Sequence, residues 1–298
     1  MTLLNKVILD SSSYRIMNLT YHRYGKAKVR VLKKLQRDSL HTIKELDVQV
    51  LLAGDFESSY SAGDNRLVVA TDTMKNTVNV LALEKLEEQT ERFALDLAQH
   101  FLEKYPHVTE VTIETSERVW QRLKADGKPS PTNFLAPQKC TPLCEVHATR
   151  ANTRLTSGVQ DLVILKSAGS GFADFHRDEF TTLPETQDRI LATRMTSKWT
   201  FAIAPADYNT TNEAILDAML ECFVTNDSPS VQKTMYDMGS AALNRCPEIS
   251  DVNLVMPNLH CLLIDLKPFG RTNPNTLFVP TDAPHGLIEA TIAREPRR

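Results

Sequence analysis

The sequence has no long uninterrupted apolar run, which excludes an ordinary transmembrane helix. No stretch approaches the roughly 18 consecutive apolar residues that such a helix needs. The apolar residues near the start are interrupted by Asn5 and Lys6 and closed by Asp10, so they do not form the core of a secretory signal. Without such a signal, the five cysteines are expected to be reduced and mostly buried. We therefore expect a cytoplasmic protein.

An excess of basic residues is also missing, and with it the usual mark of a nucleic-acid-binding protein. The formal charge is −3, and acidic and basic residues are interspersed. No glycine-rich dinucleotide loop follows a predicted strand. Most histidines are scattered. The exception is Cys140-x3-Cys144-x2-His147, whose spacing is loosely zinc-like but lacks a second pair of ligands. We expect no nucleic-acid, membrane or dinucleotide partner.

What the chain does have is enough apolar material for a sizeable core. It contains 298 residues, of which 42% are hydrophobic and 24% are charged. That length exceeds one average domain and fits two of about 150 residues each. The charged fraction is ordinary for a soluble protein.

The first half combines the periodicities of strands and helices. The expected elements are strands at about 29–31, 46–52, 111–113 and 144–148, and helices from about 73 and over about 87–105. A polar turn is expected at 37–40, Pro106 ends the second helix, and 127–131 is typical of a loop.

The second half repeats this order. The expected elements are strands at about 155–166 and 198–204, two helices, and a closing hairpin of 252–256 and 259–266. Thr210 and Glu213 have capping-box spacing, which predicts the start of the first helix. Ser228 before Pro229 predicts the start of the second, and Pro247 its end. Both halves thus follow the order strand, strand, helix, helix, strand, strand, which indicates an α+β fold.

The most informative segment is 69–76, where an apolar run ends in Thr71 and Asp72. A strand over 67–70 that breaks there would lead into a helix whose first N–H groups face a ligand. Electron-rich ligand atoms are favoured at such a helix start. Thr and Asp are also common helix caps, so ordinary capping is the alternative.

Further segments accompany this one in a fixed order along the chain. They are Tyr24-Gly25-Lys26; the run 162–167 with Ser170, Phe172, Phe175, 177–179, 181–183 and Asp188-Arg189; the run 230–236; and Pro257-Asn258 with His260. From about residue 24 to about 290, these motifs resemble the urate oxidase (uricase) family.

The resemblance implies two tandem tunnelling-fold (T-fold) domains, at 24–150 and 151–298, after an N-terminal extension of residues 1–23. Each T-fold domain has an antiparallel four-stranded sheet with two helices on one face. Subunits of the family join their sheets into a barrel, and the assembly is a homotetramer.

The resemblance also implies that Phe172, Arg189, Val231 and Gln232 bind urate as a clamp. Urate is a flat purine anion with hydrogen-bonding atoms around its rim. The forked guanidinium of Arg189 would bond two adjacent acceptors. Phe172 would stack on the ring, and the Gln232 amide and the Val231 backbone N–H would bond further ring atoms. Taken singly, Phe172 is as typical of a core residue, and Arg189 of a solvated helix residue.

At the opposite edge of the purine the resemblance assigns Thr71 and Asp72, with a Lys26–Thr71–His260 relay for protons. An ammonium is a poor base unless its pKa is lowered, and lysine is a residue type in which such shifts are common. His260 by itself is as typical of a satisfied core histidine. Asn258 would hold oxygen or water over the ring.

The implied reaction is the oxidation of urate by O2 to 5-hydroxyisourate with release of H2O2. Oxygen chemistry normally needs a metal or flavin, but in this family doubly deprotonated urate supplies the electrons and no cofactor is needed. Because the lysine and threonine come from one subunit and the clamp from its neighbour, the site is expected only in an oligomer. The chain also ends without the Ser-Lys-Leu peroxisomal address of many eukaryotic members, which again favours the cytoplasm.

Two alternatives stay open at this point. An enzyme of the same fold that acts on a pterin would hold zinc through clustered His or Cys, and a purine-binding protein without catalysis would need only the clamp. Ala168 stands where the family usually has threonine, and the N-terminal extension is longer than expected. Neither departure removes a predicted site residue.

Overall fold

The computed structural model of the chain describes residues 17–136 and 140–295. Most of the expected N-terminal extension therefore lies outside the described residues, and 17–23 contain no helix or strand.

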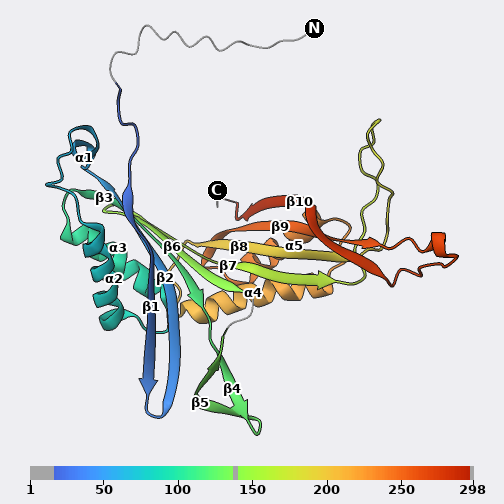
Figure 1. The fold of residues 1–298 in the computed structure, drawn as a ribbon, viewed down its shortest axis with the longest axis horizontal. Helices are drawn as coiled ribbons and strands as arrows, with labels where there is room; N and C mark the ends of the chain where they lie inside the picture. Colours follow the sequence, from blue (N-terminus) through green and yellow to red (C-terminus); the bar gives the residue numbers. More distant parts are fainter. Residues whose placement is uncertain (1–16, 137–139, 296–298) are drawn as a thin grey trace.

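A single antiparallel sheet of eight strands forms the backbone of the fold (Figure 1). In sheet order, the strands are β1 (Tyr24–Arg37), β2 (Leu40–Gly54), β3 (Val108–Arg118), β6 (Thr141–Thr149), β7 (Thr153–Lys166), β8 (Leu191–Phe201), β9 (Ile249–Leu263) and β10 (Phe278–Ala293). The pair β6–β7 joins the two halves, and β1 and β10 are the edges of the sheet.

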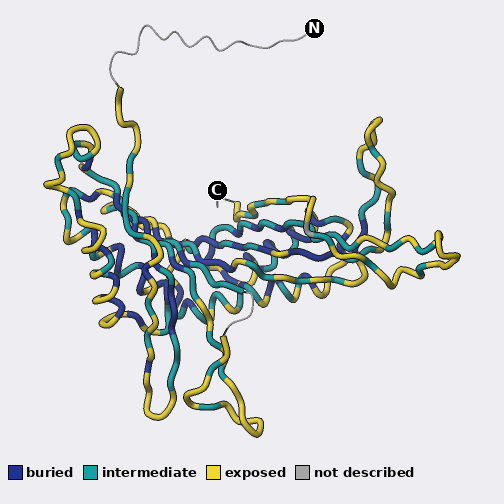
Figure 2. The backbone as a smooth tube through the Cα atoms, viewed as in Figure 1, coloured by how far each residue is buried: buried dark blue, intermediate teal, exposed yellow. Residues whose placement is uncertain are grey.

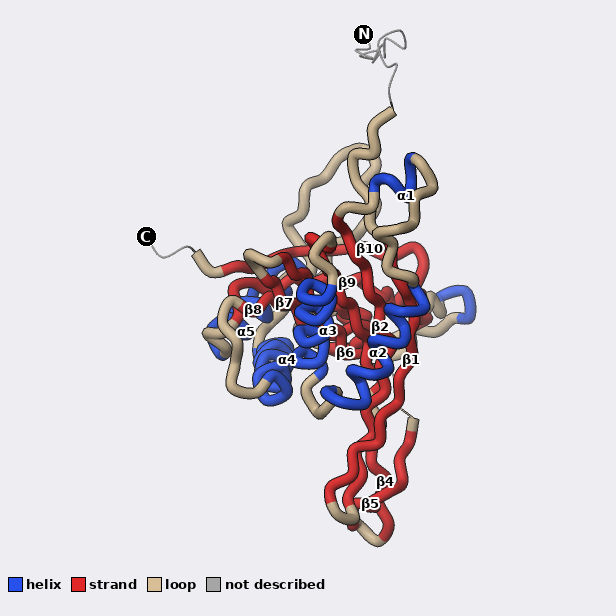
Figure 3. Tube along the Cα trace, turned by 90° about the vertical axis from the view of Figure 1, so that its left-hand side faces the viewer, coloured by secondary structure: helices blue, strands red, loops and turns tan. Residues whose placement is uncertain are grey.

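The long helices cover one face of this sheet. They are α2 (Thr71–Lys85), α3 (Thr90–Lys104), α4 (Tyr208–Thr225) and α5 (Val231–Arg245). The short helix α1 (Glu57–Ser61) and the 3-10 helix η1 (Lys267–Phe269) lie in connections away from this face. In Figure 3, α2 to α5 lie together in front of the strands. Helix α2 packs on β1, α3 on β3 and β6, and α5 on β9 and β10. Four strands and two long helices per half confirm the predicted α+β T-fold arrangement. No helix within the described ranges is long and apolar enough to cross a membrane.

The core lies between helices and sheet as two hydrophobic clusters. Phe93, Leu97 and Phe101 recur every four residues on α3, so they share one helix face, and all three are fully buried in the first cluster. Trp199 of β8 is the largest buried side chain of the second. Figure 2 shows the buried residues gathered in the strands and helices. We propose that the domain boundary falls between residues 150 and 151, in the turn that joins β6 to β7.

The expected loop at 127–131 is wrong, because a hairpin occupies this region. Strands β4 (Gln121–Ala125) and β5 (Lys128–Leu135) form a separate two-stranded sheet. Asp126 and Gly127 both have positive φ, as the tight turn between two such strands requires. Pro129 and Pro131 suggested a loop, but proline is tolerated in a strand that has a free edge.

Both predicted helix caps in the second half are wrong by two or three residues. Helix α4 is capped by Asp207, whose carboxylate accepts from the Thr210 N–H at 2.8 Å. Thr210 and Glu213 therefore lie inside the helix. Ser228 pairs with Ser170 in an isolated bridge and stays extended, so α5 begins two residues later than predicted.

The predicted closing hairpin is also wrong. Strand β9 continues through Pro257 and pairs with β10, a strand that was not predicted. The irregularity falls on the partner strand instead, as a register shift between Thr281 and Gly286. Strand β8 begins at Leu191, well before the predicted 198. The segment 67–70, expected as a strand, is irregular chain.

Replacing Asp207 by alanine should destabilise α4 at neutral pH. The backbone hydrogen bond from Thr210 lowers the pKa of the Asp207 carboxyl below its usual value. A lowered folded-state pKa means that the stabilisation is present above about pH 4 and is lost as the pH falls through the folded pKa. Loss of such a cap costs about 1 kcal/mol. Thermal denaturation should show a clear gap from the wild type at neutral pH that shrinks in acid, as the pH falls through the folded pKa of Asp207; an equal gap at both would contradict a charged cap.

Candidate active site

Phe172 and Arg189 lie together in the long connection between β7 and β8. The guanidinium carbon of Arg189 lies 5.3 Å from the centroid of the Phe172 ring. Phe175 stacks on Phe172 with centroids 4.9 Å apart and an interplanar angle of 11°. A ring stacked that closely takes up one face of Phe172, so a planar ligand can stack only on the other. The connection therefore holds an aromatic pair with a cation over the Phe172 ring.

Backbone hydrogen bonds hold this connection in place. Phe172 donates to the Thr186 carbonyl at 2.8 Å, and Thr186 donates to the Phe172 carbonyl at 3.0 Å. The Arg189 N–H donates to the Ser170 carbonyl at 2.6 Å. Ser170 in turn bridges to Ser228, just before α5. The start and end of the connection and the N-terminus of α5 thus form one framework.

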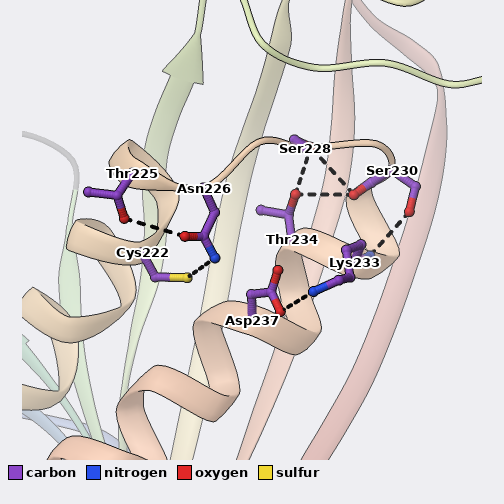
Figure 4. Close-up of polar contacts among 8 residues, drawn as sticks. All are labelled: Cys222, Thr225, Asn226, Ser228, Ser230, Lys233, Thr234 and Asp237. Atoms are coloured by element: carbon purple, nitrogen blue, oxygen red, sulfur yellow. Dashed lines mark hydrogen bonds and ion pairs between the residues drawn. The ribbon is translucent and has the colours of Figure 1, made fainter.

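The N-terminus of α5 is held by side-chain hydrogen bonds. Ser230 caps the helix by accepting from the backbone N–H three residues on, and the Thr234 hydroxyl donates to Ser228 Oγ at 2.6 Å (Figure 4). Val231 and Gln232 are the first two helical residues, and Gln232 is exposed. The N–H groups of a first turn have no partner within the helix, and the helix dipole favours an anion there.

The Nε–H group of Arg189 is a hydrogen-bond donor without an acceptor in the described part of the chain. The residue is half-buried, and burial lowers the pKa of its guanidinium from the usual value. Its Nε is buried and has no hydrogen-bond partner among the residues that the structure describes. A buried donor left unpaired costs about 1–3 kcal/mol. A ligand acceptor would remove that cost.

Asn258 and His260 lie on the sheet beside this framework. Asn258 of β9 pairs directly with Thr193 of β8, four residues after Arg189. His260 lies two residues further along β9, on the same face, opposite Thr281 of β10. Both Asn258 and His260 are partly buried. The structure therefore brings the clamp residues and these two close to one end of the second half.

Lys26, Thr71 and Asp72 gather in the first half instead. Lys26 pairs with Val50 across β1 and β2, and α2 begins at Thr71. The Lys75 ammonium, 2.5 Å from the Asp72 carboxylate, lowers the pKa of Asp72, and the nearby Lys26 charge adds a smaller effect. No side chain caps α2, so ordinary capping does not account for Thr71 and Asp72.

Tyr24 was not predicted as a site residue, yet its hydrogen bonds to Val69 tie the chain beside Lys26 to the chain beside Thr71. Its hydroxyl donates to the Val69 carbonyl at 3.1 Å and accepts from the Val69 N–H at 2.7 Å. Burial raises the pKa of Tyr24 to about 12, so the hydroxyl keeps its proton. Tyr24 lies two residues before Lys26, and Val69 lies two residues before Thr71. The only available signal was the position of Tyr24 beside Gly25-Lys26.

The two groups of residues are far apart within one chain. Strands β2, β3, β6, β7 and β8 lie between β1 and β9, and six spacings of about 4.8 Å give roughly 29 Å along the sheet. In Figure 1, β1 and α2 lie at the left and the connection after β7 rises at the right. A hydrogen bond spans about 3 Å. Lys26 and Thr71 therefore do not meet His260 within a single chain.

The side chains of the zinc-like motif Cys140-x3-Cys144-x2-His147 are not arranged to bind a metal ion together. Cys144 and His147 are three residues apart on β6, so they point to opposite faces. Burial raises the pKa of the Cys144 thiol well above its usual value, which disfavours the thiolate that zinc needs. His147 Nε2 bonds Glu110 Oε2 at 3.1 Å. Within residues 17–136 and 140–295, no three His, Cys, Asp or Glu side chains are placed to hold a metal ion.

The two similar halves, each with four antiparallel strands and two helices on one face, define a tunnelling-fold protein. The framework around Arg189 and Phe172 adds an aromatic ring and a cation held together. A protein-family model described as Uricase matches residues 22–147 and 155–289. The chain belongs to the uricase family and is an enzyme of the urate oxidase type.

Individual relatives agree over nearly the whole length. The chain is 39% identical over 280 residues to the uricase of Arthrobacter globiformis, covering 94% of this chain and 91% of that protein. It is 38% identical over 285 residues to the uricase of Schizosaccharomyces pombe, covering 91% and 96%. The crystal structure of the Arthrobacter globiformis uricase superposes with a TM-score of 0.90 at 38% identity, covering 95% of this chain and 97% of that one.

Proposed function

We propose that the protein is a cofactor-independent urate oxidase that converts urate, O2 and water to 5-hydroxyisourate and H2O2. Urate gives up two electrons and two protons, O2 takes them up to become H2O2, and water adds across the oxidised ring. The observation that carries the proposal is Arg189, whose buried and unpaired Nε lies beside the stacking face of Phe172.

The clamp residues would grip urate by its charge and its flat shape. The Arg189 fork would take two adjacent acceptors on the rim, and each charge-assisted bond is worth about 1.5–3 kcal/mol. Phe172 would stack on the ring, while the Val231 N–H and the Gln232 amide would bond further rim atoms. The N-terminus of α5 favours the negative charge of the substrate. Asn258 would hold O2 or water over the ring.

The relay residues would move the protons. The Asp72 carboxylate is engaged by Lys75 at 2.5 Å and by Asn76 at 3.0 Å. Its backbone N–H, rather than its charge, would therefore meet the anion at the start of α2. Lys26 would accept a proton and pass it through the Thr71 hydroxyl to His260 of the other subunit.

A second copy of the chain would complete this site. Strands β1 and β10 are the edges of the sheet, and an edge strand presents unpaired N–H and C=O groups. If β1 pairs with β10 of a second copy, Lys26 comes within two strand spacings, about 10 Å, of that copy's β9. The side chains of Lys26 and His260 can bridge this gap through Thr71. We propose a barrel of two chains, a homotetramer of two barrels, and a cytoplasmic location.

Urate consumption by the metal-free protein tests the proposal. The purified protein is treated with a chelator, its metal content is measured, and the urate absorbance band and O2 concentration are followed together. We expect both to fall at the same rate, with H2O2 formed in equal amount. Activity that disappears with the chelator and returns with zinc would favour the zinc-dependent alternative. A protein that binds urate without O2 uptake would be the non-catalytic alternative.

Replacing Tyr24 by phenylalanine should lower turnover in a chain that still folds. Both backbone groups of Val69 would lose their partner, and the distance between Lys26 and Thr71 would no longer be fixed. Misplacement of reacting groups is costly, so we expect kcat to fall about tenfold. Steady-state kinetics and circular dichroism check this, with Y60F as the control because Tyr60 is exposed. A Y24F enzyme with the kcat of the wild type would contradict the role of Tyr24.

A further inference from the structure

Thr193 carries a buried hydroxyl without a hydrogen-bond partner among the residues that the structure describes. The residue is 0% exposed. Leaving such a group unpaired opposes folding, and valine would fill the same space without that cost. The hydroxyl therefore has no stabilising role in the isolated chain. It leaves a donor that a group or water of the occupied site can pair with.

The register of the sheet identifies that partner. Thr193 and Asn258 are directly opposite each other on β8 and β9, so they share one face with Cβ atoms about 4.5–5.5 Å apart. Their neighbours on this face, Leu191, Met195 and Met256, are apolar and 0% exposed. Asn258 itself, unlike Thr193, is only partly buried. A buried, unpaired hydroxyl thus lies directly opposite a partly exposed carboxamide, with apolar neighbours beside it.

We propose that Thr193 is a positioning residue that orients the Asn258 carboxamide. The inference rests on the proposed function, in which Asn258 holds O2 or water over the urate ring. The Thr193 hydroxyl donates to Asn258 Oδ1, directly or through one trapped water, when the site is occupied. This bond turns the Asn258 NH2 group toward the oxygen molecule, where negative charge develops as O2 takes electrons from urate. Donors aimed at developing charge are among the strongest contributions to catalysis.

The variant T193V separates this role from a structural one. It replaces the hydroxyl by a methyl group of the same shape. We expect kcat to fall about three- to tenfold, the effect of one neutral hydrogen bond. The KM for urate should change by less than about twofold, because the clamp is intact. The melting temperature should stay equal or rise, because a buried unpaired group is gone. T193S keeps the hydroxyl and should keep most of the wild-type kcat.

Thr200 on the same strand provides a matched control. Its hydroxyl donates to Asp251 at 3.0 Å and accepts from Arg154 at 3.1 Å. The variant T200V should therefore lower the melting temperature and leave kcat unchanged, the reverse of the pattern expected for T193V.

A double-mutant cycle with N258A tests whether Thr193 acts through Asn258. If it does, adding T193V to N258A should cause no further loss of kcat. A T193V enzyme with wild-type kcat, or a T193V loss that persists in full on top of N258A, would overturn the inference while the proposed function stands. A wild-type protein that does not oxidise urate would overturn both.

Discussion

Lys26→Met should reduce kcat for urate oxidation by roughly 10²–10⁴, the usual contribution of a positioned general base, with affinity close to that of the wild type. Methionine keeps the length of the side chain and removes the amine. Lys26 lies beside the start of α2, near enough to Asp72 for its charge to affect the pKa of that carboxyl. It belongs to none of the clamp elements. Steady-state kinetics give kcat, and binding of xanthine, a purine without the 8-oxygen, gives affinity separately.

Lys34→Met is the matched control for this experiment. Lys34 lies on the same strand and is exposed, so the same substitution should leave kcat and affinity unchanged. A Lys26→Met enzyme that turns over at the wild-type rate but binds xanthine weakly would place Lys26 in the clamp. The assignment of the proton relay would then be wrong.

Arg189→Ala should act mainly on affinity. Two charge-assisted hydrogen bonds of about 1.5–3 kcal/mol each would be lost, so KM for urate and Kd for xanthine should rise by roughly 100-fold or more. Once urate is bound at saturating concentration, kcat should fall much less. Isothermal titration and steady-state kinetics on the same preparation measure both effects.

Two further variants sharpen the interpretation of the Arg189 result. Arg189→Lys keeps the charge but loses the fork, so it should recover part of the affinity and no more. Arg194→Ala removes an exposed arginine of β8 and should bind like the wild type. Full affinity in Arg189→Lys would mean that charge alone, rather than bidentate bonding, holds the substrate.

Periodicity in the sequence predicted most of the fold because it reports burial. The four-residue recurrence of Phe93, Leu97 and Phe101 predicted α3, and all three side chains are buried. The alternation around 46–52 predicted β2 for the same reason. Burial of one face against the other layer is what fixes these elements, so the pattern and the structure agree.

Local signals failed where a long-range contact decided the outcome. Ser228 has the sequence of a helix cap, but its bridge to Ser170 keeps it extended. Pro257 has the sequence of a strand end, but pairing with β10 carries β9 through it. Such contacts join residues dozens of positions apart, and a local window does not contain them.

The same contrast between local sequence patterns and long-range contacts applies to the candidate site. Motifs predicted Arg189, Phe172 and the residues at the start of α5 as site residues, and the structure places them on one hydrogen-bonded framework. They did not reveal Tyr24 or Thr193, since each acts through a partner distant in the sequence, Val69 in one case and Asn258 in the other. Motifs also do not show distances. The sheet separates β1, which carries Lys26, from β9, which carries His260, by roughly 29 Å, too far for these residues to meet within one chain.

Combining two impaired variants, at a urate concentration far below the KM of the Arg189→Ala enzyme, tests the central claim, a site shared between two chains. Lys26→Met and Arg189→Ala are co-expressed in equal amounts with the same tag, and all assemblies are purified together and assayed with urate. In a mixed pair, one of the two shared sites receives an intact Lys26 from one chain and an intact Arg189 from the other. Random pairing should therefore restore about a quarter of wild-type activity. Hybrids no more active than the two variants alone would contradict the account, because each site would then lie within one chain.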